Sequence, residues 1–290
     1  MRSIPALILD YGSSGVGKTT NALYSFPNAL FIGTRGAFHS SVHLCGYKPT
    51  TVDAKTIADA TAKLKEVSRN GKHDAVVVDD FSFLAEQTIA TYEKKYSGFK
   101  MWGAIRDDVL GFRNTAREAN CHVLLNCWQK SPQTKPDGTF VRGGPMLSGK
   151  LPEQLPAMCD MVLQCSHDAM RKPWGGVYKC EQSTRWVMKD RFNICYSLSP
   201  APMNTSEILR AAGYEISRHK DLPWQEKVVE EFSQRLDAAG HALYDTANLL
   251  FAQLIQAGIE HKAARWTLRD ALDRVVIRRA LHSTTTRFIA

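Results

Sequence analysis

The stretch from Gly12 to Thr19 reads GSSGVGKT, three glycines followed by a lysine and a threonine. It fits the phosphate-binding pattern G-x-x-x-x-G-K-[ST] at every fixed position. Glycines let backbone N–H groups curve around a phosphate because no Cβ stands in the way, and a helix that begins near Lys18 points its positive end at the anion. The pattern predicts that Lys18 reaches the β- and γ-phosphates and that the Thr19 hydroxyl faces Mg²⁺. The expected nucleotide-binding residues are Gly12, Ser13, Ser14, Gly15, Val16, Gly17, Lys18, Thr19 and Thr20.

Two aspartates follow a short apolar run further along the chain. The run AVVV ends in Asp79 and Asp80. A buried strand that delivers a carboxylate at its carboxyl end would hold Mg²⁺ through water, and Asp79 is predicted to do so. The expected ligands are therefore ATP and Mg²⁺.

The first two-thirds of the chain alternate between apolar runs and helical stretches. Residues Ala6–Asp10, Ala29–Gly33 and His122–Trp128 are predicted strands, and Ala54–Gly71 has helical spacing that ends at a glycine. Such alternation predicts an α/β domain with a mostly parallel sheet. From Met203 onward only helical patterns are found, so we expect residues 1–200 to bind nucleotide and residues 203–290 to form a helical appendage.

Composition narrows the class of protein. The chain has 290 residues, of which 44% are hydrophobic, and a net charge of +8. No apolar run approaches the roughly 20 residues of a membrane span. Seven cysteines without CxxC spacing indicate reduced thiols, so we expect a cytoplasmic protein without a membrane partner. The positive charge favours a polyanionic partner.

The chain resembles the RecA-like P-loop ATPases, and more closely the phage nucleotide-binding proteins that include single-strand-annealing recombinases. The resemblance covers about residues 4–192. It rests on YGSSGVGKTTNALYSFPNALFI, HDAVVVDDFSFL, CHVLLNCWQ, GKLPEQLPAMCDMVLQC and WVMKDRF. It implies a RecA-like P-loop core, ATP as ligand, self-association into a ring or filament, and single-stranded DNA as partner. A phage-encoded protein of this kind would work in the host cytoplasm.

The resemblance also implies roles for particular residues. The polar end of VLLNCWQ would sense the γ-phosphate, through Asn126 or Gln129. The motif KDRF resembles one that reaches the ATP site of a neighbouring protomer. Lys189 and Arg191 would then neutralise charge there in trans, like an arginine finger. A surface charge on an edge strand is the competing interpretation for both.

One position departs from the family. In RecA-like ATPases the strand after the phosphate loop usually ends in Asp-x-Glu, whose glutamate polarises the attacking water. Here LFIGTRG places Arg35 there, and a guanidinium accepts no proton near neutral pH. Asp80 could serve as the base, hydrolysis could be slow, or Arg35 could bind nucleotide or DNA. We favour slow hydrolysis of ATP. Whether the chain is an active ATPase is therefore left open by the sequence.

Two kinds of function are compatible with these observations, and a third is less favoured. The basic loop Gln129–Lys150 contains Phe140 and predicts contact with single-stranded DNA, which favours a protein of annealing, recombination or replication. The alternative is a non-catalytic, nucleotide-binding assembly or virion-associated component, and the third is a small-molecule P-loop kinase. The candidate nucleic-acid residues are Lys130, Lys135, Arg142 and Lys150.

Overall fold

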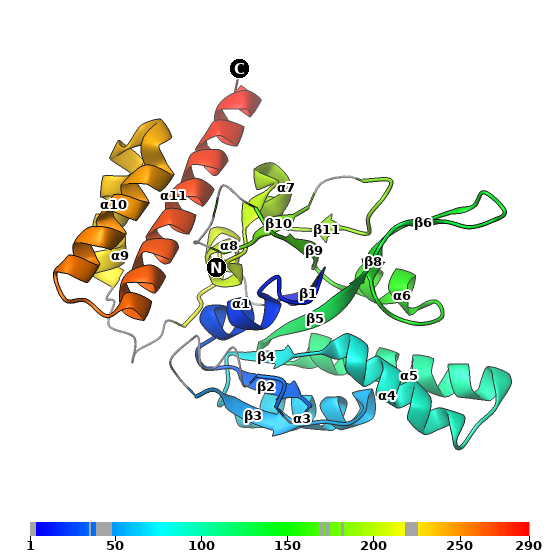
Figure 1. Ribbon diagram of the computed structural model, residues 1–290. Helices are drawn as coiled ribbons and strands as arrows, with labels where there is room; N and C mark the ends of the chain where they lie inside the picture. Colours follow the sequence, from blue (N-terminus) through cyan, green and yellow to red (C-terminus); the bar gives the residue numbers. More distant parts are fainter. Residues whose placement is uncertain are drawn as a thin grey trace.

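The computed structural model describes residues 4–34, 36–38, 48–168, 171, 175–180, 183–217 and 226–289. A central sheet runs through the N-terminal part of the chain (Figure 1). Its main strands are β1 (Leu7–Gly12), β2 (Leu30–Gly33), β3 (Thr50–Asp53), β4 (Ala75–Val78), β5 (His122–Lys130), β9 (Met161–Ser166), β10 (Val177–Lys179) and β12 (Ala201–Pro202). Their order is β12-β10-β9-β1-β5-β4-β2-β3. The strands from β9 to β3 are parallel, whereas β10 and β12 are antiparallel to their neighbours.

Alternate strand residues point to opposite faces of the sheet, and both faces are buried. Ile8 and Leu124 belong to one hydrophobic cluster, and Leu9 and Leu125 belong to the other. The first face is covered by α1 (Lys18–Ser25), α7 (Ile194–Leu198) and α8 (Thr205–Ala211); the second by α3 (Ile57–Asn70), α4 (Phe81–Glu93), α5 (Gly98–Glu118) and α6 (Leu151–Met158). The predicted fold class is confirmed in its architecture: a mostly parallel α/β core followed by helices.

Strand register brings the carboxyl ends of four strands to one edge. Gly12, the last residue of β1, is paired with Trp128 of β5 and with Cys165 of β9. Val78, the last residue of β4, is paired with Leu125 of β5. Ligands of open α/β sheets bind beyond the carboxyl ends of the strands. The register therefore gathers the predicted phosphate and metal residues at the edge where a ligand is expected.

The segment between β5 and α6 forms a projecting hairpin (Figure 1). Strands β6 (Gln133–Thr134) and β7 (Phe140–Val141) are antiparallel, and β8 (Gly144–Pro145) returns along the end of β5. Asp137 and Gly138 make the turn: the carboxylate accepts the N–H of Thr139, and Gly138 has φ 81°. The central part of the basic loop Gln129–Lys150 is therefore a hairpin.

The C-terminal helices pack on the first face of the core. They are α9 (Glu226–Ala238), a short 3₁₀ turn (Gly240–Ala242), α10 (Leu243–Gln256) and α11 (His261–Ile289). Leu23 and Tyr24 of α1 share one hydrophobic cluster with Trp266 and Leu268 of α11. The predicted boundary at residues 200–203 stays a prediction, and the hydrophobic core is continuous across it. Among the described residues, none of the helices is both long and apolar enough to cross a membrane.

Candidate nucleotide-binding site

The phosphate loop joins β1 to α1 as the sequence predicts. Gly15 and Gly17 have φ of 77° and 98°, in the left-handed region that favours glycine. The Lys18 Nζ donates to the carbonyl oxygens of Gly12 at 2.9 Å and Ser13 at 3.2 Å. The ammonium is therefore held across the mouth of the loop, where its charge faces any anion that the backbone amides bind.

Gly12 is required by close packing where the loop begins. A Cβ at this position would lie 2.8 Å from both the Cβ and the carbonyl oxygen of Cys165 on β9. The packing is closer still at Gly33, the last residue of β2, where a Cβ would lie 2.1 Å from the carbonyl oxygen of Asp79. Both glycines let neighbouring strand ends approach closely, which sets the positions of the phosphate loop and of Asp79.

Asp79 lies against the phosphate loop. Burial raises the pKa of its carboxyl, and a hydrogen bond with the Thr19 side chain and the charge of Lys18 lower it in part. Its buried Oδ2 atom has no partner of normal hydrogen-bond geometry within the described residues, and neither have the two amide atoms of Asn126, which nevertheless lies close enough to lower the pKa of the Asp79 carboxyl as well. Buried polar atoms are rarely left unpaired. These orphaned atoms therefore mark a place that a polar ligand completes.

The residues at this edge fit a Mg²⁺–nucleotide ligand. Mg²⁺ prefers carboxylate, hydroxyl and phosphate oxygens, and Thr19 and Asp79 offer the first two within contact of each other. The loop amides and Lys18 suit the polyphosphate. The phosphate loop and the predicted metal carboxylate thus form one site.

A family model described as an AAA domain matches residues 5–192. The chain belongs to the AAA-domain family. The match spans the phosphate loop, Asp79 and the strands that carry them, and it confirms the predicted P-loop ATPase core. A solved structure described as the RadB recombinase is similar to the chain, with 18% sequence identity and a TM-score of 0.40, covering 61% of this chain and 80% of that one. No curated protein matches the sequence.

Two further carboxyls of the AAA domain lie near Lys18, Asp10 fully buried and Asp80 half-buried. Asp10, on β1, is fully buried, and burial raises its pKa to about 7 while the Lys18 charge lowers it. Asp80 has its pKa raised to about 7, by burial and then by the charge of Asp79. The Asp80 Oδ1 accepts the backbone N–H groups of Ser82 at 2.8 Å and Phe83 at 3.4 Å. Asp80 therefore caps α4, and its predicted role as catalytic base stays a prediction.

The two candidate sensors lie along β5 on the same edge. Asn126 is paired in register with Asp10 and is fully buried next to Asp79. Gln129 lies beyond the last residue of β1, and its Oε1 accepts the Gln164 Nε2 at 3.2 Å. Gln129 also lines a cavity of about 470 Å³ that reaches the base of the hairpin. Either amide is close to the phosphate loop, so the choice between them stays open.

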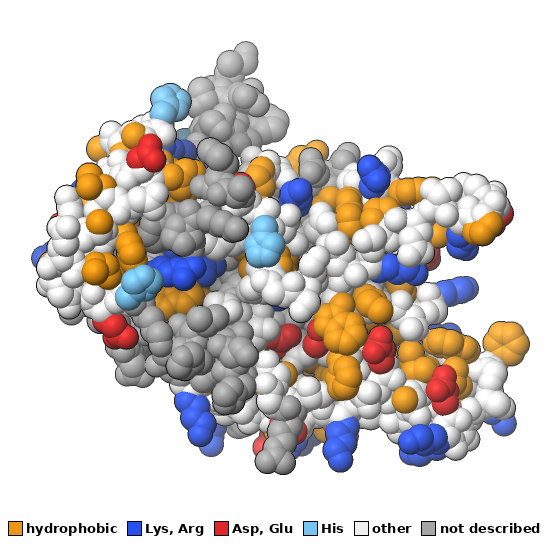
Figure 2. All heavy atoms as spheres, in the orientation of Figure 1, with side chains coloured by type: hydrophobic (Ala, Val, Ile, Leu, Met, Phe, Trp, Pro, Cys, Tyr) orange, Lys and Arg blue, Asp and Glu red, His pale blue; other side chains and the backbone are white. Residues whose placement is uncertain are grey.

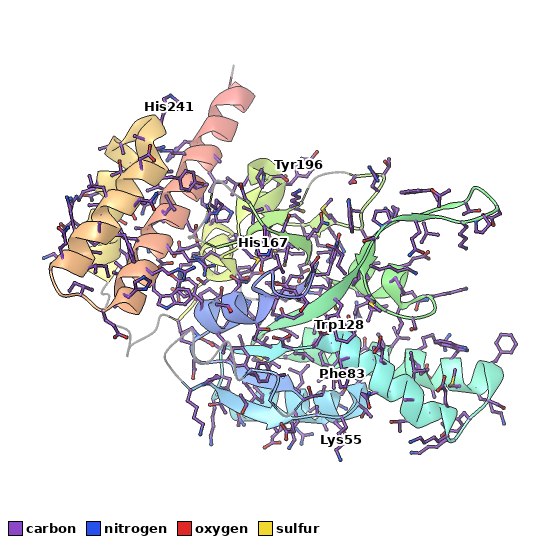
Figure 3. The ribbon with its side chains drawn as sticks, in the orientation of Figure 1. Lys55, Phe83, Trp128, His167, Tyr196 and His241 are labelled. Carbon is purple, nitrogen blue, oxygen red and sulfur yellow. The ribbon has the colours of Figure 1, made fainter. Side chains whose placement is uncertain are left out.

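An aromatic pair supports this edge from the α4 side. Phe83 of α4 and Trp128 of β5 have ring centroids 6.3 Å apart and lie next to one another in Figure 3. The backbone N–H of Trp128 donates to the Ser82 Oγ at 3.0 Å. These contacts fix the start of α4 to β5, which holds the turn that carries Asp79 and Asp80.

Lys189 and Arg191 lie at the opposite end of the sheet. Short strand β11 (Lys189–Asp190) is paired with the start of β9. The Lys189 Nζ donates to the Ala157 carbonyl at 2.7 Å, and Arg191 pairs with Asp160 at 3.3 Å. Asp160 accepts the N–H of Leu7, the first residue of β1. Strands rise about 3.3 Å per residue, so the phosphate loop is about 16 Å away, and a role in trans is the only finger role compatible with this position.

The four candidate nucleic-acid residues, Lys130, Lys135, Arg142 and Lys150, are all exposed. Within the described residues none of them forms an ion pair. Figure 2 shows Lys and Arg side chains around the projecting hairpin and the α4–α5 arm. Phe140, near the hairpin tip, is 45% exposed. The geometry thus keeps Lys135, Arg142 and Phe140 exposed on the projecting hairpin, with Lys130 at its base and Lys150 at the start of α6.

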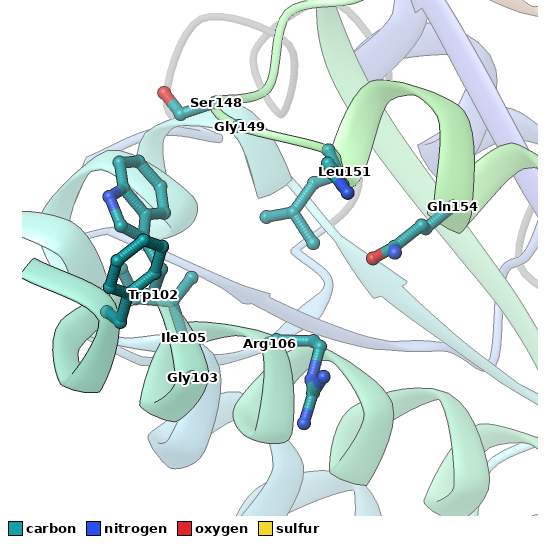
Figure 4. Close-up of a pocket in the computed structure, with 10 residues that line it drawn as sticks. Trp102, Gly103, Ile105, Arg106, Ser148, Gly149, Leu151 and Gln154 are labelled. Atoms are coloured by element: carbon teal, nitrogen blue, oxygen red, sulfur yellow. The ribbon is translucent and has the colours of Figure 1, made fainter.

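A groove of about 530 Å³ lies beside Lys150, between α5 and α6 (Figure 4). Trp102 forms one wall and Leu151 lies at the centre, with Gln154 beyond it. Phe99, which also lines the groove, is 97% exposed. The groove adds exposed aromatic surface next to the basic residues.

Arg35 lies outside the described residues, so the predicted loss of the usual glutamate stays a prediction. Asp10 is a site residue that sequence reasoning missed. It is a carboxylate at the end of the apolar run ALILD, and a charged residue on a fully buried strand is a signal that could have found it.

Proposed function

We propose that the chain is an ATP-dependent, RecA-like protein that acts on single-stranded DNA in annealing, recombination or replication, in the cytoplasm of a phage's host. The phosphate loop with Asp79 supports the nucleotide part. The observation that carries the DNA part is the continuity of β5. This strand runs from Asn126, beside the metal-facing carboxylate, through Gln129 to Lys130 at the base of the basic hairpin. A rearrangement at the phosphates can therefore bias the hairpin through one rigid element.

The hairpin has the chemistry that non-specific strand binding requires. Single-stranded DNA is held by cations that follow the backbone and by aromatic rings on which bases stack. On the hairpin, Lys135 and Arg142 supply exposed charge and Phe140 an exposed ring; Trp102 of α5 supplies a second exposed ring. The affinity of such a surface falls steeply as salt rises, because bound cations release counterions from DNA.

DNA binding is tested by fluorescence anisotropy of a labelled single strand at low salt, with and without ATP. We expect binding that ATP strengthens and that the double variant Lys135→Ala/Arg142→Ala weakens. Lys65→Ala, an exposed lysine on α3, is the matched control and should bind like the wild type. A protein that ignores single-stranded DNA in both conditions refutes this function.

Hydrolysis is proposed to be slow. Lys18 would neutralise phosphate charge, and Thr19 and Asp79 would hold the metal ion, which would supply further charge neutralisation at the phosphates. Asp80 is engaged by two backbone N–H groups as a helix cap, which disfavours its use as a base. We expect Asp80→Asn to keep nucleotide affinity and most of a low turnover. A complete loss of turnover in this variant would instead identify Asp80 as the base.

The same capping role favours the second candidate, a nucleotide-binding assembly component without catalysis. ATP turnover well above background that Lys18→Ala abolishes excludes this candidate. Electron microscopy of the protein with ATP and DNA separates a ring, a filament and a monomer.

Self-association into a ring or filament is proposed from the location of Lys189 and Arg191. They can reach phosphates only in another copy, because their own phosphate loop is at the other end of β1. Equal mixing of Lys18→Ala and Arg191→Ala proteins tests this directly. Turnover in the mixture above that of either variant alone supports action in trans, and turnover equal to their mean argues against it.

A further inference from the structure

The segment just before β11 ties the base of the hairpin to the sheet. Gly143, where the hairpin returns, donates its backbone N–H to the Arg185 carbonyl at 2.8 Å and accepts the N–H of Val187 at 2.9 Å. These two bonds flank Trp186, which forms a parallel bridge with Gly143. The same segment continues into β11, which begins three residues after Trp186. A short piece of chain thus joins the hairpin to the strand that leads into the motif KDRF.

The indole ring of Trp186 lies directly on the hairpin base. A Cβ at Gly143 would lie 2.4 Å from the ring and 2.8 Å from the Cδ of Pro132, which stands on the outgoing arm of the hairpin. Packed atoms do not approach one another this closely, so only a glycine lets the ring rest here. Trp186 therefore contacts the backbone at the point where the two arms of the hairpin come together.

Trp186 also reaches the strand that leads into the phosphate loop. Its ring is stacked with the ring of Tyr11 at a centroid distance of 6.3 Å, and the Tyr11 hydroxyl donates to the Val187 carbonyl at 2.9 Å. Tyr11 is completely buried and directly precedes Gly12, where the loop begins. A shift of the loop would therefore reach Trp186 through a packed ring and a hydrogen bond.

The charge of the hairpin lies close to the same contact. Burial raises the pKa of the Tyr11 hydroxyl, and the positive charge of Arg142 lowers it in part. Arg142 is exposed, whereas the next residue, Gly143, is buried against Trp186. Of these two neighbours, the first is a candidate DNA contact and the second is tied to the strand of the phosphate loop.

We propose that Trp186 is a positioning residue that couples the basic hairpin to the phosphate loop, so that ATP and single-stranded DNA strengthen each other's binding through its ring. The inference rests on the proposed function and adds the route by which the two sites communicate. By linkage, the effect of ATP on DNA affinity must equal the effect of DNA on ATP affinity. Strand β5 also joins the two sites, and removing the Trp186 side chain leaves β5 in place, so mutation separates the two routes.

The coupling is measured as a ratio of dissociation constants. Anisotropy of a labelled oligothymidine at low salt gives the DNA constant without nucleotide and with a saturating non-hydrolysable ATP analogue and Mg²⁺. Calorimetry gives the constant of the analogue with and without the oligothymidine. We expect a ratio of about tenfold in the wild type by both measurements. In Trp186→Ala the ratio should fall below about twofold, while each ligand alone binds within about threefold of its wild-type affinity.

Three further variants sharpen the test. Tyr11→Phe keeps the packed ring and removes only the hydrogen bond to Val187, so the ratio should fall about threefold. Trp186→Phe keeps an aromatic ring over Gly143 and should recover most of the coupling. Tyr196→Ala is the matched control, because it removes an aromatic side chain of α7 that is 47% exposed, and it should keep the full ratio.

The outcomes separate this inference from the proposed function. A full ratio in Trp186→Ala or in Tyr11→Phe overturns the route through Trp186 and leaves β5 to carry the coupling. A ratio of one in wild-type protein that binds both ligands overturns the coupling and leaves both kinds of binding intact. Loss of binding of either ligand alone in Trp186→Ala and Trp186→Phe identifies Trp186 as a support of the fold and also overturns the inference. Wild-type protein that ignores the oligothymidine overturns the proposed function itself.

Discussion

Removing one buried carboxylate should loosen the C-terminal helices from the core. Asp273 of α11 is completely buried and forms an ion pair with Arg171, whose side chain is only 4% exposed. It also accepts the Asn204 Nδ2 at 3.1 Å. Asp273→Ala leaves the Arg171 guanidinium buried without its counter-charge, and breaking a buried pair in this way costs about 3–5 kcal/mol.

The free energy of unfolding, measured by urea denaturation, gives the cost of this substitution. Asp237→Ala is the matched control: Asp237 pairs with Arg279 at 2.7 Å, but its side chain is 63% exposed, so we expect a loss below about 1 kcal/mol. Arg171→Met/Asp273→Leu removes both buried charges together and should recover most of the loss. Equal costs for Asp273→Ala and Asp237→Ala would refute the reasoning.

Three further predictions concern other parts of the molecule. Burial lowers the pKa of His122 from 6.5 to about 4. Because the unfolded chain takes up this proton at a higher pH than the folded chain, the free energy of unfolding should fall by about 3 kcal/mol as the pH drops from 7 to 4. Urea titrations of His122→Asn should lack this fall. Gly33→Ala should lower the melting temperature through its 2.1 Å backbone clash, whereas Gly111→Ala, in open helical space, should not. Lys135→Ala and Arg142→Ala should each reduce the salt slope of single-strand binding by about 0.7, measured by anisotropy over a salt series.

The phosphate loop and Asp79 could be predicted because each is recognised from a short, contiguous stretch of sequence. The loop is one contiguous pattern, and the carboxyl ends of parallel strands meet at one edge, so Asp79 had to lie near Lys18. The alternation of elements fixed the fold class in the same way. Strand β3 was missed because its four residues, TTVD, are mostly exposed and carry no apolar run.

A cavity of about 400 Å³ beside α11 could not be predicted. It joins Val16 and Gly176 to Arg265, which come together only when the tail packs on α1. The arginines of α11 have the pattern of a solvated basic face, yet Arg269 and Arg274 are buried and paired with acids. Sequence spacing reports which face of a helix is charged, but not which distant carboxylate that face meets.

The position of Lys189 and Arg191 needed the structure for a similar reason. The motif KDRF suggested a phosphate contact, and only the pairing of β11 with the start of β9 reveals which end of the sheet carries it. The motif shows that Lys189 and Arg191 are charged, and the sheet topology shows that they lie at the end opposite to the phosphate loop.

The central claim is that the phosphate loop, Lys18 and Asp79 form one Mg²⁺–nucleotide site. Calorimetric titration of ATP into the full chain tests it most directly, in Mg²⁺ and again in excess chelator. The account predicts saturable binding to a single site that weakens at least about tenfold without Mg²⁺ and disappears in Lys18→Ala. Binding that is indifferent to both the metal ion and Lys18, or no binding at all, would contradict it.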